Sequence, residues 1–171
     1  MKIVNILTNA LIAFLATSPL QAETSEMFAD RYSDYVETLR KQCIDFEAGE
    51  FHAPEIAATF ATDFNGDGRT DPIVDESRFV CSSSASMFSG GTGGGAIHVF
   101  VSQPDSTYEQ FEFLAHGNIV VTPQTRPNRP VLLLSVHSSR CDLIAAPCYA
   151  SYVWSQDGRF VSTSGAVEAS K

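Results

Sequence analysis

The residues with the clearest chemistry lie in one short segment, residues 63–71, where oxygen-bearing side chains stand at alternate positions. Such a segment can wrap a hard cation that takes six to eight oxygen ligands. Side-chain oxygens stand at loop positions one, three, five and nine, and a backbone carbonyl at position seven. The expected ion is calcium, bound as a structural part of the fold. Its expected ligands are the side chains of Asp63, Asn65, Asp67 and Asp71 and the carbonyl of Arg69.

The residues that follow distinguish between two kinds of calcium loop. An EF-hand has a bidentate Glu at position twelve, but here that position is Val74, and Pro72-Ile73-Val74 is typical of a strand. Gly68, at position six, supplies the sharp turn because glycine reaches positive φ at little steric cost. We therefore expect a loop between two strands instead of a helix-loop-helix.

The pattern Asp63-x-Asn65-x-Asp67-Gly68-x-x-Asp71 resembles the calcium loop of the integrin-type FG-GAP and VCBS repeats, which joins adjacent β-strands. The resemblance covers a single copy of the loop, and no Phe-Gly or Gly-Ala-Pro element flanks it. It implies a metal-binding β-hairpin and not a whole propeller. The alternative is a turn without an ion, since Asp, Asn and Gly favour turns on their own account. Three carboxylates crowded together without a cation would, however, repel one another.

A second candidate is the segment 136–140, which ends an apolar run directly before Cys141. His137 could act as a base towards Ser138 or Ser139, because sites are often built at the ends of strands. Adjacent residues on a strand point to opposite faces, which disfavours a contact between His137 and Ser138. The chain also lacks a Gly-x-Ser-x-Gly elbow. We expect a structural or surface histidine, with catalysis as the alternative.

Carboxylates outside the loop form a third candidate. Two of them held roughly 5 to 9.5 Å apart could hydrolyse a glycosidic bond. Spacing in the sequence does not show such a distance, so solvated acids at strand edges are the expectation. The residues concerned are Asp75, Glu76, Glu112 and Asp142.

A glycine-rich stretch covers residues 89–95, and Gly91-x-Gly93-x-x-Ala96 formally fits a dinucleotide fingerprint. No βαβ pattern surrounds the stretch, and no Lys follows it as a phosphate-binding loop requires. A flexible loop is therefore expected. Its backbone amides could hold an anion or the loop of a partner.

The N-terminus indicates export. Residues 1–22 fit a secretory signal peptide, with Lys2 first, an apolar stretch from Ile3 to about Ala16, and Pro19 before the expected cleavage site. The apolar stretch contains polar residues and is too short for a membrane span, which needs about 20 residues. The expected location is periplasmic or extracellular, without a membrane span in the mature chain.

The charge limits the partners. The formal net charge is −9, and it becomes −10 without residues 1–22, which contain Lys2 and no acid. Such a chain would repel nucleic acid. A cationic protein or an envelope component is a more suitable partner. The alternative is that negative charge only keeps the domain dissolved.

The four cysteines fit an oxidising compartment, where an even set favours disulfides. Three pairings are possible. Cys141 and Cys148 are close in sequence and bracket Pro147, which favours a local disulfide and leaves Cys43 to join Cys81. Zinc is the competing interpretation, but the chain has no Cys-x-x-Cys spacing and its histidines are scattered.

Hydrophobic periodicity predicts the elements that position these residues. Apolar residues recur at helical spacing from about Ser25 to Gln42, which predicts an amphipathic helix. After Pro54 the pattern changes to short strands, with an apolar run at 131–136 typical of a strand buried on both faces, and Asp157-Gly158 is a hairpin turn signal.

The sequence thus predicts a β-dominated α+β domain, in which an N-terminal amphipathic helix packs on an antiparallel sheet or sandwich of seven or more short strands. The expected function is an exported calcium-binding interaction module. The alternative is a secreted hydrolase that uses His137 or a carboxylate pair. The expected organisation is a signal peptide at 1–22, a helix and linker at 23–49, a β-rich domain at 50–162 and a loose tail at 163–171.

Overall fold

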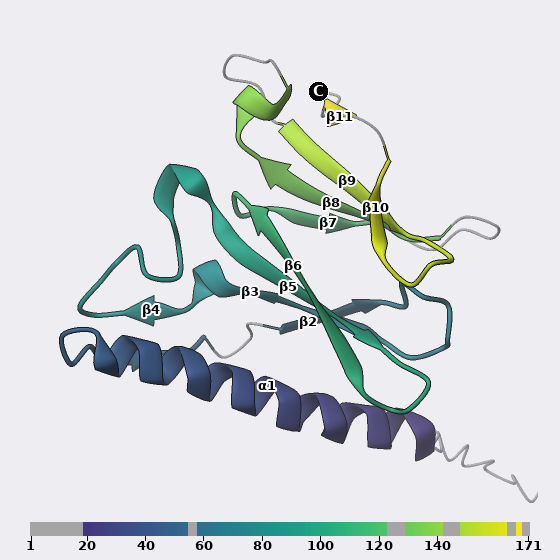
Figure 1. Ribbon diagram of the computed structural model, residues 1–171, viewed down its shortest axis with the longest axis horizontal. Coiled ribbons are helices and arrows are strands. Elements are labelled where there is room, and N and C mark those ends of the chain that lie inside the picture. The colour runs from purple at the N-terminus through teal and green to yellow at the C-terminus, as the bar shows by residue number, and fades with distance from the viewer. Residues whose placement is uncertain (1–18, 55–57, 123–128, 142–147, 164–166, 169–171) are drawn as a thin grey trace, which may run out of the picture.

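The protein combines one long helix with three antiparallel sheets (Figure 1). Helix α1 runs along one side of the molecule, and the sheets lie on the other side of it. The predicted β-dominated α+β class is therefore confirmed. The computed structural model describes residues 19–54, 58–122, 129–141, 148–163 and 167–168.

Helix α1 spans Pro19–Asp45 and so extends beyond both ends of the predicted helix. Its start lies within the segment predicted as a signal peptide, and proline suits the first turn because that turn needs no N–H donor. The helix ends before Glu47 and Ala48, whose φ angles of 52° and 53° are left-handed. A left-handed residue cannot continue a right-handed helix.

The apolar stripe of α1 packs on the sheet beside it, as the helical spacing predicts. The ring of Phe28 lies 5.5 Å from that of Phe100 and 5.8 Å from that of Tyr108, edge to face in both cases. Leu39 and Cys43 are buried further along the same stripe. Tyr32, Tyr35 and Val36 are partly buried against this cluster.

The sheet next to α1 has four strands in the order β2-β3-β5-β6. The predicted hairpin around residues 63–71 is present as β2 and β3, which pair antiparallel. Side chains of β5 alternate between two cores, with Phe100 facing α1 while Ile97 and Val99 face the second sheet. The strands are β2 Ala58–Thr62, β3 Asp71–Asp75, β5 Gly95–Ser102 and β6 Tyr108–Ala115.

The second sheet has the order β10-β9-β8-β7, with β11 also paired to β9. Strand β8 is buried on one face only, because Leu132, Leu134 and Val136 are buried while the residues between them are half-exposed. The expectation of burial on both faces at 131–136 is therefore wrong. The strands are β7 Ile119–Val121, β8 Val131–Val136, β9 Cys148–Trp154, β10 Phe160–Ser162 and β11 Val167–Glu168.

Two disulfides close the fold with the pairing favoured from the sequence. Cys43–Cys81 joins the end of α1 to a two-stranded sheet formed by β1 Phe51–His52 and β4 Val80–Cys81. Cys141–Cys148 joins the end of the short 3-10 helix Ser138–Cys141 to the first residue of β9. Both disulfides agree with an oxidising compartment. In the part of the chain that the structure describes, no helix combines the length and the apolar composition that a membrane span needs.

Candidate functional site

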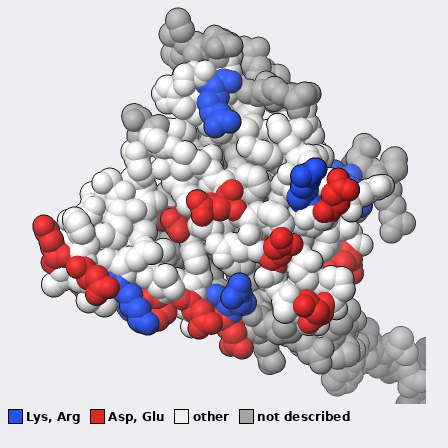
Figure 2. All heavy atoms as spheres, viewed as in Figure 1, with Lys and Arg blue, Asp and Glu red and all other residues white. Residues whose placement is uncertain are grey.

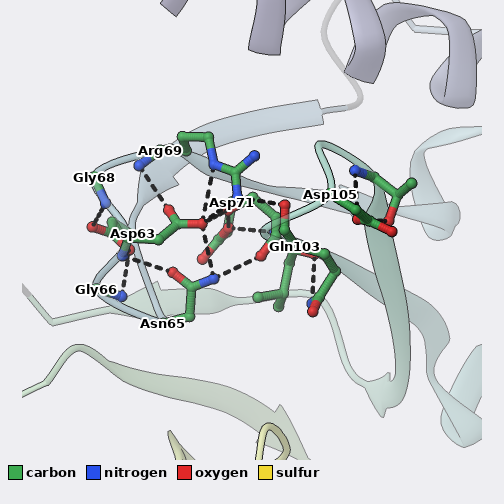
Figure 3. Close-up of polar contacts among 12 residues, drawn as sticks. Asp63, Asn65, Gly66, Gly68, Arg69, Asp71, Gln103 and Asp105 are labelled. Carbon is green, nitrogen blue, oxygen red and sulfur yellow. Dashed lines mark hydrogen bonds and ion pairs between the residues drawn. The ribbon is translucent and has the colours of Figure 1, made fainter. Parts of the chain in front are cut away.

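The candidate calcium loop connects β2 to β3 and lies beside the turn between β5 and β6 (Figure 3). Phe64 anchors the loop, since its side chain is fully buried in the core between the four-stranded sheet and the second sheet. The ring of Phe64 lies 5.1 Å from that of Phe160. The loop is therefore fixed to the core by one apolar side chain, while its other side chains are polar.

Asp63 organises the loop by accepting backbone hydrogen bonds. Its Oδ1 accepts from the N–H groups of Gly66 at 2.6 Å and Asp67 at 3.1 Å, and its Oδ2 accepts from Gly68 at 2.8 Å. Gly66 and Gly68 have φ angles of 84° and 86°, which favour glycine. The turn predicted at Gly68 is thus present, and Gly66 provides a second one.

Asp67 is the most heavily contacted acid of the loop. Its Oδ2 accepts from the Arg69 guanidinium, with Nη2 at 2.6 Å and Nε at 3.0 Å, while its Oδ1 accepts from the Arg69 backbone at 2.9 Å. Burial acts to raise the pKa of Asp67, but these hydrogen bonds outweigh it and leave the pKa below its ordinary value. The guanidinium side chain of Arg69 therefore balances the charge of Asp67.

Asp71 is buried beneath the loop and joins it to the neighbouring hairpin. Its Oδ2 accepts from the N–H of Phe64 at 2.7 Å, and its Oδ1 accepts from the N–H of Ser102 at 2.9 Å. Burial raises the pKa of Asp71 to about 6, although both hydrogen bonds act to lower it. Asp71 thus ties the start of β3 to the end of β5.

The last residue of β5 and the residue after it supply partners that the sequence did not reveal. The hydroxyl of Ser102 lies 2.9 Å from Oδ2 of Asp67 and 2.9 Å from Oδ1 of Asp71. The carbonyl of Ser102 accepts from Asn65 at 2.7 Å, and that of Gln103 accepts from Arg69 at 2.6 Å. The available signal in the sequence was Ser102, a polar residue at the end of the apolar run of β5, but its position does not indicate that it contacts Asp67 and Asp71.

The donor set fits calcium in its chemistry, since the four side chains predicted as ligands carry oxygens and the ion prefers oxygen ligands. Their present contacts are with protein donors: Asn65 directs its amide nitrogen at Oδ2 of Asp67, 3.2 Å away. Among the described residues, no group of three His, Cys, Asp or Glu side chains is placed to hold a metal. A calcium ion would therefore have to displace the guanidinium of Arg69 from Asp67.

The second candidate, His137, is exposed directly after β8. Its Nδ1 lies 2.7 Å from Oγ of Ser139 and accepts the Ser139 N–H at 3.2 Å. Ser138 and Ser139 belong to the short 3-10 helix Ser138–Cys141. In the described part of the chain, no carboxylate contacts His137. The histidine and the hydroxyl of a catalytic triad are therefore in contact, but the acid that would orient the histidine is not among the described contacts.

The predicted carboxylates that the structure describes have different surroundings. Asp75 caps a short 3-10 helix, accepting from the N–H of Ser77 at 3.0 Å. Glu76 contacts other residues, and Glu112 is exposed on β6. Asp142 lies outside the described residues.

Glu76 belongs to a polar network beneath α1 that the sequence did not reveal. Its Oε1 accepts from the hydroxyl of Tyr35 and lies 3.0 Å from Nε2 of His98, whose Nδ1 lies 2.8 Å from Nε2 of Gln110. Burial acts to raise the pKa of Glu76, but the hydrogen bonds from His98 and Tyr35 lower it below its ordinary value. Burial first, and then Glu76, raise the pKa of Tyr35.

The glycine-rich stretch folds back on itself. A short 3-10 helix covers Gly91–Gly93, the N–H of Gly90 donates to the carbonyl of Gly94 at 2.9 Å, and that of Gly93 donates to Gly90 at 2.9 Å. These amides are therefore used within the stretch, and the fold around it has no parallel βαβ unit in the described residues. The dinucleotide interpretation gains no support.

A scan against protein-family models and searches of curated proteins and of solved structures gave no match for this chain. The likeness to FG-GAP and VCBS loops thus remains a resemblance of one short segment. Function has to be argued from the geometry above.

Proposed function

We propose that this protein is an exported binding module and that its 63–71 loop holds one structural calcium ion. The observation that carries the proposal is that the four side chains predicted as ligands lie in one hydrogen-bonded loop, which is joined by hydrogen bonds to the end of β5 and the residue after it. An ion there would join two hairpins of the same sheet. A structural and not a catalytic ion follows from this position.

The chain offers five ligands to such an ion. Asp63, Asn65, Asp67 and Asp71 would provide side-chain oxygens, and Arg69 its carbonyl. Calcium supplies two positive charges, which would replace the single charge of the guanidinium beside Asp67. The loop is pre-ordered by the hydrogen bonds to Asp63, so binding would order little additional backbone.

The effect on stability would be small. Extracellular calcium modules bind at about 10⁻⁴ to 10⁻³ M, and calcium at ten times its dissociation constant adds about 1.4 kcal/mol to the free energy of unfolding. For a domain of this size, that corresponds to a rise in melting temperature of about 3 to 6 °C. A change of this size is measurable.

The decisive experiment compares melting temperatures with millimolar calcium and with chelator. We expect calcium to raise the midpoint of the parent protein, and Asp67→Asn to remove that rise because it removes a ligand oxygen charge. Asp157→Asn is the matched control, since Asp157 is an exposed acid in the β9–β10 turn. An unchanged midpoint in the parent protein would reject the calcium site.

The binding role is supported by charge. The formal net charge is −9, and acidic side chains are spread over the sheets and along α1, where basic ones lie between them (Figure 2). Such a surface attracts cationic partners over a distance set by the ionic strength. A secreted hydrolase is the less supported function. The hydroxyl that His137 contacts belongs to Ser139, only two residues further along the chain, so local chain geometry accounts for this contact.

A further inference from the structure

Two histidines from different sheets lie together at the edge of the molecule, away from the calcium loop. His116 follows β6 and His137 follows β8, and their ring centres are 5.8 Å apart with the ring planes inclined at 50°. His116 is half-exposed and His137 is exposed. Neither ring has a role in the function proposed above.

The backbone brings these two histidines together. The N–H of His116 donates to the carbonyl of Ser135 at 2.7 Å, and the N–H of Ser135 donates to the carbonyl of Asn118 at 3.1 Å. These bonds hold the residues after β6 against Ser135, near the end of β8. The backbone positions of the two histidines are therefore set by hydrogen bonds between the chain after β6 and β8.

The glycine-rich stretch supports His116. Gly94 has a φ of 88°, and a Cβ at this position would lie 2.4 Å from the carbonyl oxygen of Ala115 and 3.4 Å from Cδ2 of His116. A side chain at residue 94 would thus displace the backbone that carries the histidine. Gly94 is required here because the backbone of residue 94 lies close to that of Ala115, and the glycine-rich stretch thereby helps to position His116.

Ser139 holds the ring of His137 at Nδ1, which accepts the Ser139 N–H and lies beside the Ser139 hydroxyl. Nε2 is the ring nitrogen that Ser139 does not contact, and its binding to a metal requires the ring proton to move to Nδ1. A histidine that binds a metal through one nitrogen is held by a hydrogen bond at the other. With Nε2 on a metal, Nδ1–H would donate to the Ser139 hydroxyl, and the N–H of Ser139 would give up its hydrogen bond to Nδ1.

We infer that His116 and His137 form a two-histidine site for a divalent transition-metal ion, zinc or copper. Imidazole nitrogens suit these ions, whereas calcium prefers oxygen. Metal–nitrogen bonds of about 2.0 to 2.1 Å to both rings place the ring centres roughly 5 to 6 Å apart, and the observed separation is 5.8 Å. Water or a group from a bound partner completes the coordination.

The test uses the full protein without an affinity tag and two ions, zinc for calorimetry and copper for electron paramagnetic resonance. We expect one zinc site, an affinity at least about tenfold lower in both His116→Asn and His137→Asn, and a copper spectrum with hyperfine coupling to two imidazole nitrogens. His52→Asn is the matched control, because His52 is exposed on β1 away from the two rings. Its zinc affinity should equal that of the parent protein.

Three results would overturn the site: equal zinc affinity in the parent protein and both His→Asn variants, a loss in only one of them, or copper without imidazole coupling. Gly94→Ala tests the support, and it should weaken zinc binding while Gly93→Ala does not, because a Cβ on Gly93 meets nothing within 4 Å. Asp67→Asn should leave zinc binding unchanged. The histidine site and the calcium loop therefore stand or fall separately.

Discussion

At the scale of single residues, Arg69 is the side chain that a calcium ion in the proposed site would have to displace. Its guanidinium contacts Asp67, and both side chains are largely buried, with exposed fractions of 13% and 26%. This ion pair and a calcium ion would use the same carboxylate. Arg69 therefore stabilises the loop without calcium, and it would compete with the proposed ion for Asp67.

This dual role predicts opposite effects for Arg69→Gln. In chelator, the free energy of unfolding of the variant should be about 1 to 2 kcal/mol below that of the parent protein, because a charged hydrogen bond to Asp67 is lost. In calcium titrations it should bind more tightly by up to about tenfold, since the competing cation is gone. Urea unfolding and calorimetry measure the two effects.

The control for this prediction is Arg159→Gln, whose guanidinium lies 3.9 Å from Asp157 with both side chains exposed. Exposed pairs contribute little, so this variant should change neither quantity. Lower calcium affinity in Arg69→Gln would show that Arg69 assists the ion, contrary to the competition argued here.

At the scale of elements, the network of Tyr35, Glu76 and His98 fastens α1 to the sheet. Tyr35 comes from the helix, Glu76 from the 3-10 helix Glu76–Arg78 after β3, and His98 from β5. His98 is satisfied on both sides when Gln110 donates to Nδ1 and Nε2–H donates to Glu76. Buried polar groups that are all paired fix one docking geometry for the helix.

The network predicts a pH dependence of stability. The pKa of Glu76 is lower in the folded protein than its ordinary value of 4.5, so the stabilisation is present above that value and is lost as the pH falls through the folded pKa. At pH 7, Glu76→Gln should lower the free energy of unfolding by about 1 to 3 kcal/mol. Near pH 3.5 the difference between variant and parent should shrink, as urea unfolding at both pH values would show.

Glu109→Gln serves as the control, because Glu109 is exposed on β6. Its effect should be small at both pH values. A cost for Glu76→Gln that stays constant down to pH 3.5 would mean that the ionised carboxylate does not stabilise the fold.

The elements also show how far the sequence leads. Helical spacing located α1, the Asp and Gly pattern located the β2–β3 hairpin, and the short separation of Cys141 and Cys148 gave their disulfide. Contacts between distant strands were not predictable. Ser102 meets Asp71, and His116 meets His137, only because of strand register and sheet order, which no local pattern encodes.

At the scale of the whole molecule, charge provides the remaining argument about partners. The formal net charge of −9 acts over about a Debye length, which is about 10 Å at 0.1 M salt. If binding is electrostatic, the immobilised protein should retain a basic partner from an envelope extract at about 0.05 M salt and release it near 0.5 M, as mass spectrometry of the eluate would show. An immobilised protein of equal charge and unrelated fold is the control, because retention by both reflects charge alone. Retention of no basic protein, together with turnover of a generic ester or glycan, would instead favour the hydrolase.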